Sequence, residues 1–263
     1  MLAKLLKYDL KYMIKNMSVF YILAIFFAIV SRILNLFDNT VMIAILSGIS
    51  SGCMYSMMAS ILINTMLRSW IRFSDSIYKD EAYLTHTLPV TKNDIYNSKF
   101  IQTLIFFIIG FLVILLSIFV AFYTPEWWES VKELLLQVTT GLNFNMTLFV
   151  IGMLLVIFLE VFNAIQCGFL GIILGHKKNN KKTGFSVLYG FIFYLVSQVL
   201  IVILIFTVGL FTSGVMDLFK TNAQISPDSF KLLIVLAIIF YLFITWIISM
   251  ICKEKLRDGV NIE

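Results

Sequence analysis

Six long apolar runs constrain what this chain can fold into. They cover residues 17–37, 41–67, 100–123, 146–175, 185–211 and 232–252. A helix needs about 20 apolar residues to cross a bilayer core of about 30 Å. We therefore expect an all-α, polytopic membrane protein with six transmembrane helices. The composition agrees, because 60% of the 263 residues are hydrophobic and 13% are charged, against about 45–50% and about 25% in soluble domains.

Lysine and arginine gather on one side of these runs. Four lysines precede the first run, five basic residues lie in segment 68–99, four in segment 177–182 and three in segment 253–257. Only Lys132, Lys220 and Lys231 lie on the opposite side. Basic flanks mark the cytoplasmic face, so we expect both termini in the cytoplasm of a cell whose plasma membrane holds the chain. The net charge of +5 favours contact with anionic lipid and not with nucleic acid, since the basic segments are short and adjoin membrane spans.

The segments outside the runs are short, so we expect a single transmembrane domain over residues 1–263. In segment 1–16 apolar residues recur at helical spacing opposite the lysines, which predicts an amphipathic helix in the membrane interface. Residues 124–145 form a predicted external loop with a short helix at 126–138, where two tryptophans suit the headgroup region. Residues 212–231 form the last predicted external loop.

Enzyme signatures are missing from the sequence. The stretch GHKKNNKKT approaches a phosphate-binding loop, but Asn180 stands where the second glycine belongs. Three cysteines without CxxC spacing predict neither a disulfide nor a metal site, and we expect the chain to bind no cofactor. Both histidines are interpreted as solvated loop residues. An intramembrane enzyme using Glu160 is a weaker alternative, because no second catalytic group is apparent at the same depth.

Polar side chains inside the spans are the candidate lining of a translocation path. Placing a polar side chain in lipid costs free energy, so such a side chain should face protein or a water-filled cavity. Packing between helices and a role in the path both explain these positions, and the sequence leaves the two alternatives open. The candidates are Ser56, Ser60 and Asn64 in the second run, Glu160 and Asn163 in the fourth, and Tyr194 and Gln198 in the fifth.

Segment 68–99 is the longest cytoplasmic connection and contains the stretch KDEAYLTHTLPV. We expect a helix over residues 74–88, stopped by a proline. Thr91 and Asp94 then match a capping box that opens the next helix. A short rigid helix that connects the cytoplasmic ends of two membrane helices would let a soluble partner bind there and move both of them. The candidate contact residues are Ile77, Tyr78, Asp80, Glu81, Tyr83, Leu84, Leu88 and Pro89.

The stretch YKDEAYLTHTLPVTKNDIYNSKF and the opening LLKYDLK resemble ATP-binding-cassette (ABC) exporter permeases of the second class, ABC2-type bacterial membrane subunits. The resemblance implies that segment 68–99 holds a cytoplasmic coupling helix that docks on a separate ATPase. It also implies that residues 1–16 form a connecting helix, and that two permease chains, identical or homologous, assemble with two ATPase subunits that bind ATP and Mg.

These observations predict the permease subunit of an ATP-driven exporter, without a nucleotide-binding domain of its own. An apolar path edged by a few polar groups suits amphipathic peptides, antimicrobials or lipids, and the resemblance points to peptide export or antimicrobial resistance. A membrane scaffold or sensor that does not transport, but uses the same loop to hold a partner, is the alternative from another functional class.

Overall fold

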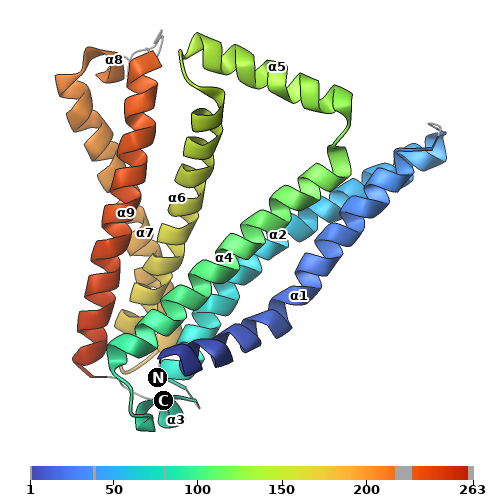
Figure 1. Cartoon of the computed structure of the whole chain (residues 1–263). Helices are drawn as coiled ribbons and strands as arrows, with labels where there is room; N and C mark the ends of the chain where they lie inside the picture. Colours follow the sequence, from blue (N-terminus) through green and yellow to red (C-terminus); the bar gives the residue numbers. More distant parts are fainter. Residues whose placement is uncertain (1, 38–39, 80, 217–226, 260–263) are drawn as a thin grey trace. The chain divides into compact units, whose positions relative to one another are not determined.

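The chain is helical throughout the residues that its computed structural model describes, which are 2–37, 40–79, 81–216 and 227–259. Six helices in this part of the chain are long and apolar enough to cross a membrane, namely α1, α2, α4, α6, α7 and α9 (Figure 1). The prediction of an all-α chain with six candidate spans is confirmed. The helices are α1 (Leu2–Leu34), α2 (Val41–Ile77), α3 (Ala82–Thr87), α4 (Lys92–Phe122), α5 (Pro125–Gly141), α6 (Met146–Gly175), α7 (Lys182–Phe211), α8 (Ser213–Met216) and α9 (Pro227–Arg257).

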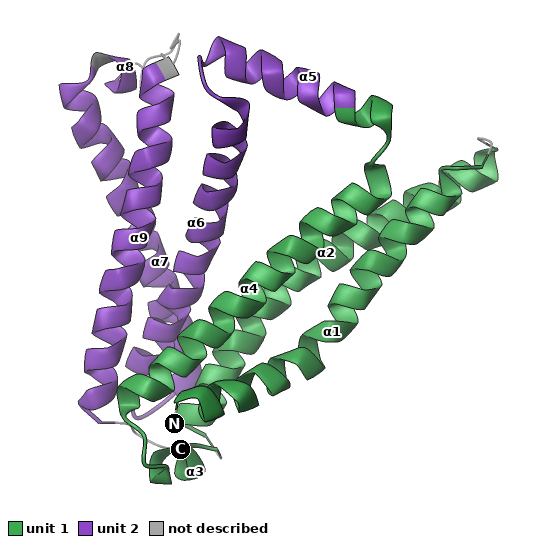
Figure 2. Ribbon diagram, in the orientation of Figure 1, with its two compact units in different colours: residues 1–128, 262–263 green, residues 129–261 purple. Residues whose placement is uncertain are grey.

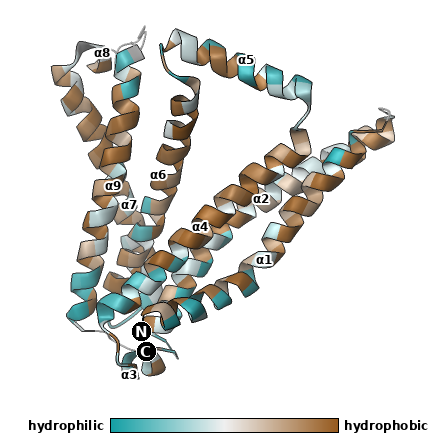
Figure 3. Cartoon of the chain, in the orientation of Figure 1, coloured by the Kyte–Doolittle hydropathy of each residue, from teal (hydrophilic) through white to brown (hydrophobic). Residues whose placement is uncertain are grey.

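The helices divide into two compact units (Figure 2). Unit 1 contains α1, α2, α3 and α4, and α1 packs along both α2 and α4. Unit 2 contains α6, α7, α8 and α9, with α6 packed against α7 and α9. The boundary falls after Trp128, inside α5. Hydrophobic residues extend along the membrane-spanning helices of each unit, and hydrophilic residues concentrate near helix ends (Figure 3).

The long helices of unit 1 continue well beyond their apolar runs. Helix α1 has 33 residues and α2 has 37, so at 1.5 Å per residue they measure roughly 50 Å and 55 Å. The stretch expected as a separate interfacial helix, residues 1–16, is continuous with the first span in α1. Its first turns run at an angle to the rest of the helix (Figure 1).

The core of unit 1 forms where α1 meets its two neighbours. Met13 and Met17 of α1 pack against Phe106 of α4 in one cluster of buried side chains. Farther along, Ala28 packs with Met54 in a second cluster, which joins α1, α2 and α4. The small alanine side chain allows the helix backbones to approach closely, as expected for helices that associate within lipid.

The connection between α2 and α4 differs from the single helix expected over residues 74–88. Helix α2 runs on to Ile77, the chain then turns, and α3 begins at Ala82. The predicted capping box at the start of α4 is confirmed. Asp94 N donates to Thr91 Oγ1 at 3.1 Å, and Thr91 N donates to the Asp94 carboxylate at 3.4 Å.

Unit 2 depends on close contact between α6 and α7. A methyl group placed on Gly171 would lie 2.5 Å from the carbonyl oxygen of Ser186 and 2.6 Å from Gly190 Cα. A methyl group on Gly175 would likewise clash with Ser186. By contrast, a methyl on Gly48 or Gly52 of α2 would meet nothing within 4 Å. The glycines of α6, and not those of α2, therefore mark a close approach of two helices.

The connections outside the spans follow the sequence only in part. Helix α5 covers the 126–138 stretch expected as a short helix. In segment 212–231, α8 follows Thr212 and α9 already begins at Pro227, while residues 217–226 lie outside the described part of the chain. His176, expected in a solvated loop, is buried with 3% of its surface exposed, and its Nδ1 lies 2.8 Å from the carbonyl oxygen of Ile172.

Candidate functional site

A buried cluster of charges joins the three long helices of unit 1. Asp9 of α1 is 2% exposed. One oxygen of its carboxylate accepts from Arg72 Nε of α2 at 3.0 Å and from Lys99 Nζ of α4 at 2.5 Å, and the other accepts from Ser98 Oγ at 2.8 Å. Hydrogen bonds to charged groups are stronger than neutral ones. A single carboxylate thus fixes the relative positions of α1, α2 and α4.

The guanidinium of Arg72 extends this cluster to the segment that follows α2. Its Nη1 donates to Glu81 at 2.5 Å, and its Cζ lies 4.9 Å from the centre of the Tyr12 ring. His86 Nε2 lies 3.1 Å from the carbonyl oxygen of Ile77 and satisfies a backbone acceptor at the end of α2. The charges of the cluster balance, because two carboxylates face one guanidinium and one ammonium.

These two contacts explain why the chain turns after Ile77. Arg72 and Glu81 are nine residues apart, which in a continuous helix would place them about 13 Å apart along the axis and on opposite faces. His86 and Ile77 have the same separation. Both pairs can form only if the helix is interrupted between them. Tertiary contacts therefore override the local tendency to continue the helix.

The exposed side of α3 is apolar, although α3 is only six residues long. Tyr83 is 62% exposed and Leu84 is 73% exposed, and Leu88 and Pro89 are also exposed. Large apolar side chains grouped on a polar end of a protein are typical of contact surfaces for other molecules.

The remaining candidate contact residues are placed differently. Ile77 and Tyr78 are buried at the end of α2, where they position the turn and do not face solvent. Glu81 is half exposed, but its carboxylate is bound to Arg72. Asp80 lies outside the described residues.

A second cluster of polar side chains lies among the helices of unit 2. Glu160 of α6 is close enough to act electrostatically on Tyr194 of α7 and on Tyr241 of α9, and Gln198 lies beside Tyr241. Asn163 Nδ2 donates to Ser197 Oγ at 2.9 Å, and both residues are buried. Unit 2 therefore brings together four of the candidate path residues, which are Glu160, Asn163, Tyr194 and Gln198.

The three candidate path residues of α2 belong to unit 1. Ser56 is exposed, and its hydroxyl donates to the carbonyl oxygen of Gly52 one turn earlier at 3.0 Å. Asn64 Nδ2 donates to the carbonyl oxygen of Ser60 at 2.9 Å. Such bonds satisfy a polar side chain within its own helix. Their role in a path stays a prediction.

The residue at the centre of each cluster was not predicted from the sequence. Asp9 lies on the same helix face as Met13 and Met17, at intervals of four residues, and a lone carboxylate on an apolar face is a signal of a buried ion pair. Its partners Arg72 and Lys99 lie among the basic residues of segment 68–99, a pattern that indicates only the cytoplasmic face, and Tyr241 lies within an apolar run that gives no signal of a polar cluster. No family model, no curated protein and no solved structure matches this chain.

Proposed function

We propose that this chain is the membrane-spanning permease subunit of an ATP-driven exporter of the ATP-binding-cassette type, located in a bacterial plasma membrane with both termini in the cytoplasm. A separate ATPase, in two copies, supplies ATP and Mg chemistry, and a second permease chain completes the complex. The observation that carries the proposal is α3, a short segment with exposed Tyr83 and Leu84, whose N-cap residue Glu81 pairs with Arg72 of α2 and through it with the Asp9 cluster.

The arrangement around α3 suits the transfer of motion. A partner that pushes on Leu84 would move Glu81, which holds Arg72, and Arg72 shares the Asp9 carboxylate with Lys99. Force applied to α3 therefore acts on α1, α2 and α4 through short, charge-assisted contacts. In the proposed cycle, ATP binding by the partner moves α3, and the helices rearrange between inward and outward access.

The polar cluster of unit 2 is the proposed contact for cargo. A carboxylate beside tyrosine hydroxyls and an amide, within helices that are otherwise apolar, offers both charge and amphipathic surface to a bound molecule. Amphipathic peptides, antimicrobials and lipids fit that combination better than sugars, which need many hydrogen-bonding groups.

Site-specific photocrosslinking in bacteria tests the partner. A photoreactive residue at Leu84 is expected to capture a protein with a GxxxxGK[ST] loop, whose ATP turnover in the purified complex responds to added amphipathic peptide. The matched control places the same group at Ile45, an equally apolar position near the opposite end of α2, where 58% of the side chain is exposed. Capture of such an ATPase at neither position, or equally at both, would contradict the proposal. A captured ATPase that never responds to peptide or lipid would favour the scaffold alternative.

Two substitutions in α3 distinguish loss of the proposed ATPase contact from unfolding of α3. Leu84→Asp should abolish co-purification of the ATPase, because it places a charge in the proposed apolar contact. Thr87→Asp introduces the same charge at another exposed position of α3 and should leave co-purification largely intact. Equal loss in both variants would mean that α3 had unfolded and that Leu84 is not a specific contact.

A further inference from the structure

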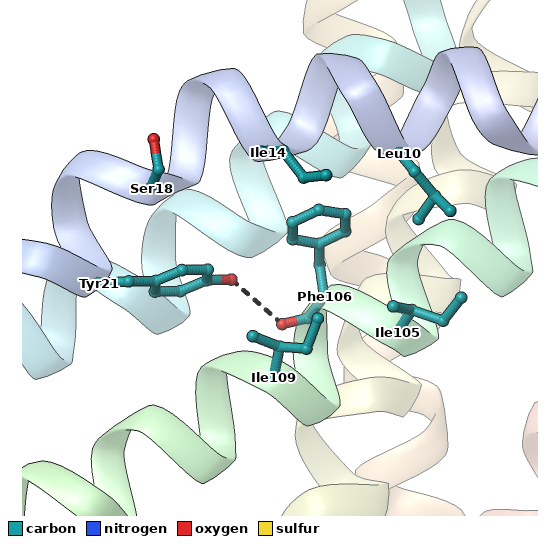
Figure 4. Close-up of a pocket in the computed structure, with 7 residues that line it drawn as sticks. All are labelled: Leu10, Ile14, Ser18, Tyr21, Ile105, Phe106 and Ile109. Atoms are coloured by element: carbon teal, nitrogen blue, oxygen red, sulfur yellow. Dashed lines mark hydrogen bonds between the residues drawn. The ribbon is translucent and has the colours of Figure 1, made fainter.

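An apolar groove runs between α1 and α4 of unit 1 (Figure 4). Its volume is about 390 Å³, and its walls include Leu10 and Ile14 of α1 and Phe106 and Ile109 of α4. The hydroxyl of Tyr21 donates to the carbonyl oxygen of Phe106 at 3.4 Å and bridges the two helices. Binding pockets for small molecules have volumes of about 300–1,000 Å³, so the groove is large enough to hold part of a ligand.

A second hollow, of about 480 Å³, adjoins the groove along α1. The two share Leu10 and Ile14, and the second hollow is also lined by Lys7 and Lys11. Both lysines are exposed, and no carboxylate of the described residues forms an ion pair with either ammonium group. Two cations without an ion pair among the described residues therefore stand beside one end of the apolar groove.

The length of α1 places these cations at the membrane surface. Its 33 residues span roughly 50 Å, which exceeds a hydrocarbon core of about 30 Å by several turns. Because the apolar run of α1 begins only at residue 17, we place the first turns, with Lys7 and Lys11, among the lipid headgroups and Ile109 beside acyl chains. Ile14 is 58% exposed and Ile109 is 38% exposed, so lipid can reach the groove.

We propose that this groove binds one anionic phospholipid, with an acyl chain along Leu10, Ile14 and Phe106 and the headgroup phosphate between Lys7 and Lys11. Bulk lipid already solvates apolar surface, so the acyl chain alone would bring little preference for this position. The two lysines supply the selectivity, because basic residues near a bilayer attract anionic headgroups. The bound lipid would occupy the gap between α1 and α4, next to the contacts that hold Asp9.

Native mass spectrometry of the full-length protein in detergent tests the proposal, with phosphatidylglycerol as the probe. Each lysine near an anionic headgroup is worth about fivefold in affinity, so Lys7→Gln with Lys11→Gln should weaken phosphatidylglycerol binding by about 30-fold. The matched control is Lys4→Gln with Lys15→Gln, which removes the same charge from the same exposed face of α1, at two lysines that line neither the groove nor the adjoining hollow. The control pair should change the affinity by less than about threefold. Equal losses in the two double variants would overturn the proposal.

Three further measurements identify the occupant. Phosphatidylcholine should bind more weakly to the native chain and be insensitive to both lysine pairs. Glycerol 3-phosphate, which has the headgroup but no acyl chain, should not compete; competition at equal concentration would show a simple phosphate site and refute the groove. Ser18→Phe fills the groove beside Tyr21 and should reduce phosphatidylglycerol binding in a variant that still elutes as a folded species. A dimer that Ser18→Phe dissociates without changing lipid binding would show that a second copy covers the groove, and would also refute the proposal.

Discussion

Replacing Asp9 by asparagine tests whether the buried charge cluster holds unit 1 together. The substitution keeps the size of the side chain and its hydrogen bond with Ser98, but removes the charge shared by Arg72 and Lys99. Loss of one partner from a buried ion pair costs about 3–5 kcal/mol, because the other charge stays buried without compensation. Arg72 would keep Glu81 as a partner, whereas the Lys99 side chain is 6% exposed and keeps none of its ion pairs. We therefore expect a loss at the lower end, about 3 kcal/mol.

The free energy of unfolding of the full-length protein can be measured in mixed micelles, by titrating dodecyl sulfate into a mild detergent and following tryptophan fluorescence. The matched control is Asp228→Asn, which removes the carboxylate that pairs with Lys231 at 3.4 Å on the surface, where the aspartate side chain is 94% exposed. Exposed pairs contribute about 0–1 kcal/mol, so the control should be almost neutral.

A double-mutant cycle with Lys99→Met then isolates the contact itself. If the two charges depend on each other, the double variant should be less destabilised than the sum of the single variants, with a coupling free energy of about 1–3 kcal/mol. Additive effects, or an Asp9→Asn loss no greater than that of Asp228→Asn, would refute the inference that this carboxylate joins the helices.

Three other predictions follow from single contacts. Gly171→Ala should lower the free energy of unfolding by about 1–3 kcal/mol, because it overpacks α6 against α7. Gly52 has open space around it, so Gly52→Ala should raise the free energy of unfolding by up to about 1 kcal/mol. Equal effects of the two variants in detergent unfolding would contradict the packing argument. Thr91→Ala should cost about 0.5–2 kcal/mol by removing the cap of α4, and hydrogen exchange should rise in the first turn of α4 but not in α3. A hydrogen bond from Lys177, together with the charge of Lys255, holds the pKa of Asp258 below its usual value. The contacts of the Asp258 carboxylate therefore persist at neutral pH and are lost only as the pH falls through that lowered pKa. A carboxyl titration by NMR that gives an ordinary aspartate pKa would contradict this prediction.

The features that sequence predicted well are those set by local pattern. Long apolar runs predicted six helices because a bilayer accepts little else, and the Thr91–Asp94 spacing predicted the cap of α4 because the contact lies within one turn. The charge cluster could not be predicted in the same way. Asp9 and Lys99 are 90 residues apart, and nothing in either local stretch specifies the other.

The end of α2 before α3 is a second feature that local sequence did not predict. Residues 78–81 contain neither glycine nor proline, so local propensity gives no reason to end a helix there. The reason is the pairing of Glu81 with an arginine on a helix already fixed by Asp9. A contact that depends on three helices decided the local structure of one short segment.

The two ion pairs of Arg72 differ in strength, and this difference bears on how α3 could move. The pair with Asp9 is buried, and breaking it would leave Asp9 with Lys99 alone and Arg72 with Glu81 alone, at a place where water cannot replace the lost contact. The pair with Glu81 involves a carboxylate that is 50% exposed; if it breaks, water solvates Glu81 while Arg72 keeps Asp9, so the cost is nearer to that of a surface pair, about 1 kcal/mol. The Glu81 contact is therefore the weaker of the two, and it limits the force that α3 can pass through Arg72 to α1 and α4. In the proposed cycle, α3 moves the helices as long as Glu81 stays paired with Arg72, while the buried contacts of Asp9 keep α1, α2 and α4 together.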